Sequence, residues 1–150
     1  PPSSFASRKE RVAEEVMALF LTQTDLRKEF LGTLHPEVKA FLAKQPLFFF
    51  VLQAGEHDPL SLIEDKELKS LATGLAFRLL EGPEFTDLSE DEIAVKSRAL
   101  LEEYLGILLE EVGKNEKLRT IEMALTEARK NNNKEEELRL LQEFVELSKR

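Results

Sequence analysis

Residues 89–112, SEDEIAVKSRALLEEYLGILLEEV, contain the longest helical pattern in the chain. Ser89 is followed three residues later by Glu92, which is the spacing of a capping box at a helix N-terminus. Apolar residues then keep one face in register over about five turns; they are Ile93, Ala94, Leu100, Leu101, Tyr104, Leu105, Leu108 and Val112. The pattern predicts a long amphipathic helix and favours an all-α fold.

Shorter segments upstream repeat this periodicity. Residues 7–21 predict an amphipathic helix, Thr24 or Asp25 can cap a second, and Pro36 suits the first turn of a third. The run LFFFVL at 47–52 fits a buried strand and a buried helix equally well, and we assign a helix because no second strand exists to pair with it. A short helix is expected to begin at Pro59. Another, from Glu64 to Gly82-Pro83, carries Leu68, Leu71, Leu75, Phe77 and Leu79.

Downstream, residues 113–115 (Gly-Lys-Asn) predict a bend, after which helicity resumes. The three asparagines at 131–133 predict a chain reversal, because asparagine tolerates the left-handed backbone region. A last helix is expected from about Lys134. The predicted fold is therefore all-α: a compact helical bundle followed by a long bent helix and a C-terminal antiparallel helical hairpin. The expected divisions are a linker at 1–6, a bundle at 7–112 and a hairpin at 113–150.

Composition narrows the function classes. A formal charge of −8 in 150 residues argues against direct nucleic-acid binding, which needs clustered Lys and Arg. The absence of Cys excludes disulfides and thiolate zinc sites, and it fits a cytoplasmic protein. The longest unbroken apolar stretch, 47–52, is far shorter than the ~20 residues of a membrane-spanning helix, so no membrane association is expected.

Motifs for catalysis or cofactor binding do not occur. The two histidines, His35 and His57, both stand beside prolines or near them in expected loops, and we interpret them as solvent-facing residues, not metal ligands. Gly-x-Gly and Gly-x-Ser-x-Gly are both missing. We therefore expect a non-catalytic domain that needs no cofactor and no metal.

The last helix has more apolar surface than one neighbour can cover. Successive residues about 100° apart place Leu138, Leu141 and Val145 on one stripe. A second stripe beside it holds Leu140, Phe144 and Leu147. One antiparallel helix buries roughly one stripe, so the other faces the bundle or a partner; a projecting hairpin slightly favours the partner. The predicted partner-binding residues are Leu140, Phe144, Leu147, Leu125, Glu122 and Arg129.

Four segments carry a resemblance to a known family. They are AEEVMALFL at 13–21, FTDL at 85–88, LRTIEMALTEAR at 118–129 and ELRLLQEFVELSK at 137–149. Their content and their order resemble the C-terminal helicase-binding domain of bacterial DNA primase, the DnaG type. The resemblance covers nearly the whole chain and is strongest in the tail.

This resemblance implies a bundle similar to the helicase's own N-terminal domain, with the terminal hairpin as the docking element. The implied partner is the N-terminal domain of the hexameric replicative helicase. Docking would recruit the primase to the fork and stimulate the helicase during primer synthesis. The zinc and polymerising domains of such a primase would lie upstream. Some members also bind the acidic tail of single-strand-binding protein. The basic candidates for that contact match no fixed spacing; they are Arg27, Lys28, Lys39 and Lys44.

A second hypothesis remains open: a self-associating helical module, either a replicative helicase N-terminal domain or an unrelated oligomerisation bundle. A primase adaptor should be monomeric without its partner. In the adaptor interpretation, replacing Phe144 and Leu147 together by alanine is expected to abolish helicase binding and leave helicity almost intact.

Overall fold

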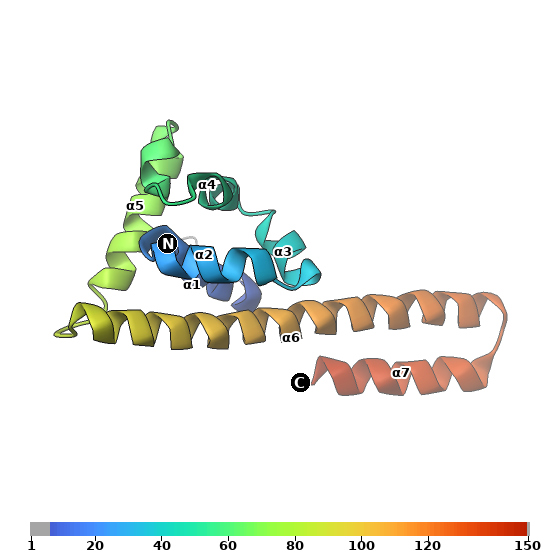
Figure 1. Ribbon diagram of the computed structural model, residues 1–150. Coiled ribbons are helices and arrows are strands. Elements are labelled where there is room, and N and C mark those ends of the chain that lie inside the picture. The colour runs from blue at the N-terminus through green and yellow to red at the C-terminus, as the bar shows by residue number, and fades with distance from the viewer. Residues whose placement is uncertain (1–6, 150) are drawn as a thin grey trace. The chain divides into compact units, whose positions relative to one another are not determined.

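The computed structural model describes residues 7–149, which form helices and no strands (Figure 1). This confirms the predicted all-α class, while the predicted linker at 1–6 lies outside the described residues. The elements in chain order are α1 (Arg8–Thr22), α2 (Thr24–Phe30), the 3-10 helix η2 (Leu31–Thr33), α3 (Pro36–Leu42), α4 (Pro46–Ala54), the 3-10 helix η3 (Pro59–Leu62), α5 (Lys66–Leu80), α6 (Glu90–Lys130) and α7 (Lys134–Ser148). None of the helices in this described part is long and apolar enough to cross a bilayer.

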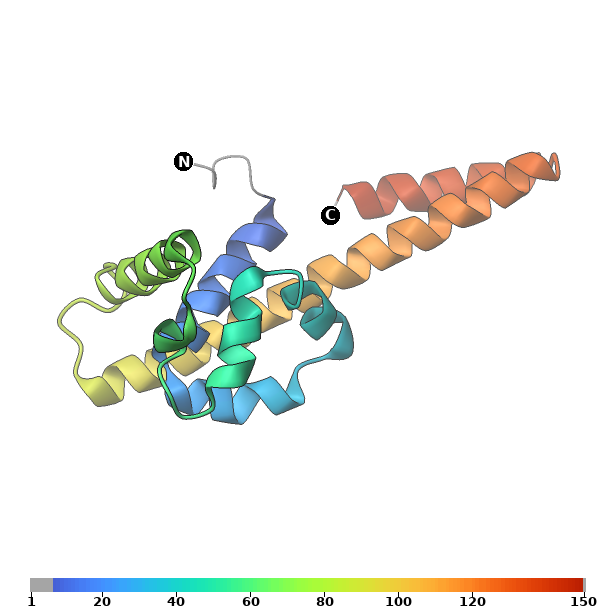
Figure 2. The same ribbon diagram turned by 90° about the horizontal axis from the view of Figure 1, so that it is seen from above.

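The chain divides into two compact units, and α6 contributes to both. Unit 1 ends at Leu109 and unit 2 begins at Glu110, three residues before the predicted division after residue 112. Unit 1 contains α1 to α5 with the first half of α6. Unit 2 contains the second half of α6 and α7, which runs back beside it (Figures 1 and 2).

Unit 1 has a hydrophobic core centred on α1. The side chains of Val16, Leu19 and Phe20 are fully inaccessible to solvent, and α1 packs chiefly against α5, with α2 and α4 also in contact. Leu101 and Leu108 of α6, seven residues apart, are fully buried in the same cluster. The first half of α6 is therefore part of this core.

Helix α4 confirms the helical assignment of 47–52. Leu47, Phe48 and Val51 are buried, whereas the Phe49 side chain is 60% exposed and contacts Phe50 edge-to-face with ring centroids 5.4 Å apart. The prediction that the run is buried thus holds for one face only. A helix that packs by one face leaves the opposite face to solvent, whatever its composition.

The inner face of α5 differs from the predicted one. The expected face included Leu71 and Phe77, but these side chains are 52% and 65% exposed. Leu75 and Leu79 of the predicted face are buried, and Ala72 and Ala76 complete the buried face in place of Leu71 and Phe77. The small side chain of alanine lets two helix backbones approach closely. The correction places Phe77 on the outer surface of α5.

The capping box at the start of α6 is confirmed. The backbone N–H of Glu92 donates to Ser89 Oγ at 3.2 Å, and the backbone N–H of Ser89 donates to Glu92 Oε1, also at 3.2 Å. The hydrogen bond that the Glu92 carboxylate accepts from the Ser89 backbone N–H lowers the pKa of that carboxyl. The reciprocal pair satisfies two backbone donors at the helix N-terminus and fixes where α6 begins.

The predicted interruption at 113–115 is wrong, because α6 continues through these residues as one 41-residue helix. A Cβ added at Gly113 would meet no atom within 4 Å, so packing does not require glycine there. Glycine in a helix interior costs about 1 kcal/mol relative to alanine. The Glu and Lys residues on either side favour helix, and the long hydrogen-bonded ladder outweighs this local cost.

Ser97 introduces a buried polar atom into α6, and its replacement should stabilise the protein. Its side chain is fully buried, and its Oγ has no hydrogen-bond partner among residues 7–149. Ser97→Ala removes this unsatisfied hydroxyl, so we expect the free energy of unfolding to rise by about 1 kcal/mol. Chemical denaturation measures this change. The control is Ser70→Ala at an exposed helical position, which changes helix propensity alone; equal effects of both variants would contradict the prediction.

Candidate partner-docking site

The three asparagines between α6 and α7 build the turn of the terminal helix pair. Asn132 has a left-handed backbone with φ 56°, and the N–H groups of Asn132 and Asn133 donate to the carbonyls of Arg129 at 3.2 Å and Ala128 at 2.9 Å. This is the hydrogen-bond pattern of a Schellman motif. The Asn133 side chain also caps α7, accepting from the N–H of Glu136 at 3.3 Å. The predicted chain reversal is confirmed.

Asn132 offers a test of this turn. An alanine Cβ is strained in the left-handed region by about 1 kcal/mol or more, whereas glycine adopts it freely. We expect Asn132→Ala to lower the free energy of unfolding by about 1 kcal/mol and Asn132→Gly to leave it within about 0.5 kcal/mol. Thermal unfolding followed by circular dichroism compares the two. A loss of stability in the glycine variant as large as in the alanine variant would argue against a conformational cause.

Unit 2 has a small core between its two helices. Ile121, Leu125 and Ala128 of α6 are 7%, 7% and 5% exposed, and Leu140 of α7 is 4% exposed. The partly buried residues packed against them are Ala124, Leu141, Phe144 and Leu147. The stripe of Leu140, Phe144 and Leu147, which we call the inner stripe, is therefore the face of α7 that packs on α6.

This burial corrects the predicted partner-facing surface. Leu140 and Leu125 are buried within unit 2, and Phe144 and Leu147 are partly covered there. α6 covers mainly the inner stripe, which the sequence predicted to be open, and Leu141 of the other stripe also packs on the shared core. Of the six residues proposed for partner binding, the exposed ones are Glu122 and Arg129.

Two of the three side chains on the other stripe of α7 are open to solvent. We call Leu138, Leu141 and Val145 the outer stripe; Leu138 is 63% exposed, Val145 is 47% exposed and Leu141 is partly buried. Lys134 and Lys149 stand near its two ends. Two large aliphatic side chains on one face of a short helix form an apolar patch of the kind that protein interfaces cover.

Charged side chains order the rest of the helix pair. Arg129 Nε donates to Glu137 Oε1 at 3.0 Å, which links α6 to α7 beside the turn. On α7, Arg139 binds both Glu136 and Glu143, with Nη1 2.5 Å from Glu143 Oε1. The hydrogen bond from Arg139 lowers the pKa of the Glu136 carboxyl. Two carboxylates of α7 thus share one guanidinium.

The histidines are exposed, as predicted. His35 Nδ1 accepts from the N–H of Glu37 at 3.2 Å and caps α3, while the His57 carbonyl accepts from Arg27 Nη2 at 3.0 Å. Within residues 7–149, no three His, Asp or Glu side chains are grouped so that they could hold a metal ion.

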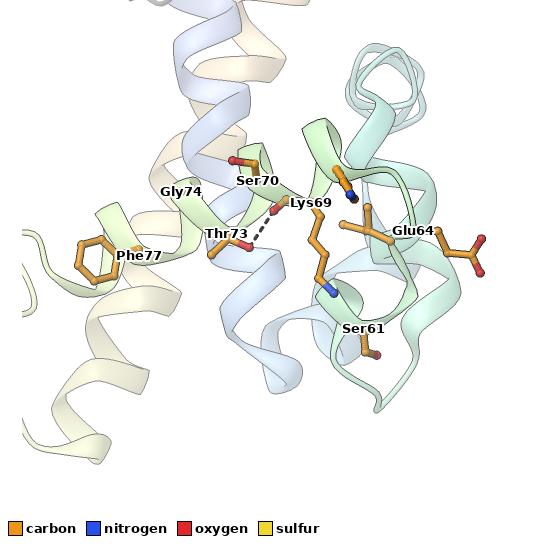
Figure 3. A pocket seen from close by; sticks show the side chains of 9 residues that line it. Ser61, Glu64, Lys69, Ser70, Thr73, Gly74 and Phe77 are labelled. Carbon is orange, nitrogen blue, oxygen red and sulfur yellow. Dashed lines mark hydrogen bonds between the residues drawn. The ribbon is translucent and has the colours of Figure 1, made fainter.

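A second surface feature, which the sequence argument did not identify, is a shallow hollow of about 970 Å³ along the outer face of α5. Figure 3 shows the Lys69 side chain reaching toward Ser61, while the Glu64 carboxylate points away and Phe77 projects at the far end. The Thr73 hydroxyl donates to the Lys69 carbonyl at 2.8 Å. The full lining is Ser61, Ile63, Glu64, Lys66, Lys69, Ser70, Thr73, Gly74 and Phe77. Lys66 and Lys69, one turn apart, enter no ion pair with any other described residue.

Two of the four basic residues considered from the sequence have structural roles. Arg27 is 3% exposed and donates to the Phe20 carbonyl at 2.6 Å. Lys28 forms an ion pair with Glu56 on the surface, and this contact raises the pKa of the lysine. Lys39 and Lys44 are exposed. Arg27 is therefore excluded as a contact for a ligand, and Lys28 is already engaged.

Comparison with known proteins does not assign the chain to a family. No family model, no curated protein and no solved structure matches this chain.

Proposed function

We propose that this chain is the non-catalytic helicase-binding domain of a bacterial DNA primase of the DnaG type. In this proposal unit 1 is the helical bundle, and unit 2 is the antiparallel hairpin that docks on the N-terminal domain of the hexameric replicative helicase. Docking recruits the primase to the fork and stimulates the helicase during primer synthesis. The domain is cytoplasmic, monomeric alone, and makes no direct contact with nucleic acid.

The observation that supports this function best is the outer stripe. A helical hairpin whose last helix leaves Leu138 and Val145 largely exposed presents apolar anchors at helical spacing, which is how amphipathic helices enter the grooves of other proteins. The resemblance of the tail, residues 118–149, falls on the same two helices. The sequence resemblance and the exposed apolar surface thus both point to the terminal helix pair.

Charge at the ends of the outer stripe disfavours the alternative, a self-associating module. If two copies of α7 paired antiparallel with Leu138 opposite Val145, Lys134 would lie opposite Lys149 of the second copy. If the two copies of α7 paired in parallel, Lys134 of one copy would lie opposite Lys134 of the other. Like charges that face each other across an interface oppose association, so the stripe suits a different protein better than a second copy.

One titration tests both the identity of the partner and the effect of binding on the helicase. The purified chain is added to the cognate replicative helicase hexamer while complex formation and the ATPase rate of the helicase are followed. We expect a stable complex and a faster ATPase. A helicase that neither binds the chain nor changes its rate would refute the proposal.

Sedimentation of the chain alone distinguishes the proposed adaptor from the self-associating module. We expect a single species of about the 17.2 kDa chain mass over a hundredfold range of concentration. A dimer or larger assembly that persists on dilution would instead favour the self-associating module.

The hollow on α5 supports a second contact, with the acidic and apolar tail of single-strand-binding protein. Lys66 and Lys69 supply two positive charges on a chain of net charge −8, and the exposed Phe77 supplies apolar surface beside them. An acidic peptide with a large apolar side chain complements both features. This proposal moves the contact from the four basic residues considered earlier to α5.

A fluorescent peptide copied from the tail of the cognate single-strand-binding protein tests this contact. We expect Lys66→Glu with Lys69→Glu to weaken binding at least tenfold. The matched control is Lys39→Glu with Lys44→Glu, which makes the same change in net charge on α3 and the residues after it. Equal losses in both double variants would indicate a general charge effect and contradict the site.

A further inference from the structure

One wall of the hollow on α5 is formed by η3 and the residues that follow it. Ser61 and Ile63 line the hollow on this side, and Figure 3 shows the Lys69 side chain reaching from α5 toward Ser61. A carboxylate bound by Lys69 would therefore lie beside Ser61. The position of η3 thus determines where Lys69 can hold an acidic group.

The position of η3 depends on hydrogen bonds that begin at a buried arginine. Arg27 Nη2 donates to the His57 carbonyl at 3.0 Å. The next residue, Asp58, accepts at its backbone carbonyl from Ser61 Oγ at 2.6 Å and from the Ser61 N–H at 3.1 Å. Its Oδ1 accepts from the Leu60 N–H at 3.0 Å. The guanidinium is thus connected to the wall of the hollow through His57 and Asp58.

The arginine end of this connection is fixed, whereas the loop end is not. Arg27 is 3% exposed, and it also donates to the Phe20 carbonyl at 2.6 Å and to Thr24 Oγ1 at 3.2 Å. Residues 55–58 are exposed, and Pro59, the first residue of η3, has no N–H to donate. Exposed backbone of this kind opens locally at little cost in free energy. Loss of the hydrogen bond from the guanidinium therefore loosens the loop and the start of η3.

We propose that Arg27 is a positioning residue for the acidic, apolar peptide that the hollow on α5 binds. The inference rests on the proposed contact with the tail of single-strand-binding protein, and it adds a buried residue that does not line the hollow. By holding the His57 carbonyl, Arg27 keeps η3 beside α5, so that Ser61 and Lys69 face the peptide together. Without this bond the wall is in place for only part of the time. The apparent dissociation constant then rises in inverse proportion to that fraction.

Peptide binding by Arg27 variants tests the inference. The probe is a fluorescent peptide copied from the tail of the cognate single-strand-binding protein, and the temperature is one at which every variant is fully folded. Arg27→Met removes every donor, and we expect it to weaken binding about fivefold, the factor that corresponds to the net contribution of one hydrogen bond. Arg27→Lys keeps the charge but does not span the Phe20 and His57 carbonyls at once, so its affinity should lie between those of Arg27→Met and the unaltered chain.

Two controls separate positioning from charge and from stability. Lys28→Ala also removes one positive charge from α2, but Lys28 forms an exposed ion pair with Glu56, and exposed pairs contribute little. Leu108→Val alters a fully buried side chain of the unit 1 core that does not line the hollow. Both variants should bind the peptide as the unaltered chain does.

Amide hydrogen exchange supplies a readout that a general loss of stability would not produce. The N–H groups of Ser61 and Ile63 donate to the carbonyls of Asp58 and Leu60. In Arg27→Met these two amides should exchange faster relative to the amides of α1, because the opening is local. Leu108→Val should leave that ratio unchanged.

The possible results distinguish the inference from the contact on which it rests. Unchanged peptide binding by Arg27→Met, or an equal loss of binding in Leu108→Val, would overturn the positioning role and leave the hollow as the place of contact. If the unaltered chain does not bind the peptide, the contact fails and the inference fails with it. The docking of unit 2 on the helicase has its own titration and does not depend on this result.

Discussion

Replacing Arg27 by alanine is expected to lower the free energy of unfolding by about 3 kcal/mol, more than any other single change in unit 1 considered above. Arg27 is buried in α2 and joins three parts of the chain. Nη1 donates to the Phe20 carbonyl of α1, and Nη2 donates to Thr24 Oγ1 at 3.2 Å and to the His57 carbonyl at 3.0 Å. No described carboxylate forms an ion pair with it. The guanidinium is thus held by neutral oxygens.

The electrostatics of the Arg27 guanidinium agree with a role in holding α1, α2 and the loop at His57 together. Burial lowers the pKa of the Arg27 guanidinium, and the Asp58 carboxylate partly opposes that shift. Its Nε has no hydrogen-bond partner among the described residues, so the site already tolerates one unmet donor. A planar group with several donors spans the Phe20 and His57 carbonyls at once, which the single ammonium of lysine does not. Arg27→Lys should therefore restore only part of the lost stability.

Two further variants make the Arg27 prediction specific. Arg27→Met keeps most of the apolar stem but leaves two carbonyls without their donor, and it should still cost about 2 kcal/mol. Lys28→Ala, one residue along and exposed, should leave the melting temperature unchanged. Guanidinium denaturation of these four variants and of the unaltered chain gives the comparison. A methionine variant as stable as the unaltered chain would mean that Arg27 acts through packing alone.

Sequence patterns predicted the fold where a local chemical signal determined the backbone. Ser89 and Glu92 marked the start of α6, and the asparagines marked the reversal before α7, because capping and left-handed backbone depend on a few neighbouring atoms. Gly113 misled the prediction for a related reason. A helix-breaking preference of about 1 kcal/mol is a local quantity, whereas a 41-residue helix is determined by its whole length.

The docking surface was only half predictable from sequence. Periodicity identified both stripes of α7, but which stripe faces α6 depends on the rotation of one helix about its axis. The turn sets that rotation. Asn133 caps α7 and also bonds to the Ala128 carbonyl, and this register buries Leu140. The hollow on α5 was missed because Ala72 and Ala76, not Phe77, form the inner face of that helix.

Replacing both Leu138 and Val145 by serine is expected to abolish helicase binding, with an affinity loss of a hundredfold or more. Each large apolar side chain that an interface buries contributes about 1.5–3 kcal/mol, and each 1.4 kcal/mol is a factor of ten. Both side chains are already largely or about half exposed in the free chain and neither belongs to the shared core, so the change should leave the helix pair intact. Far-ultraviolet circular dichroism should be unchanged, while titration against the cognate helicase should show no complex.

The inner stripe supplies the matched comparison. Phe144→Ala with Leu147→Ala was expected from the sequence to leave helicity intact, but both side chains pack on α6, so the pair should lose about 2–4 kcal/mol of stability. Because the shared core has only four buried residues, this loss should melt α7 and reduce the helical signal. The two double variants thus separate docking from folding. If the outer pair melted α7 and the inner pair did not, α7 would be rotated on α6 by about a third of a turn, and the docking face would be the inner stripe.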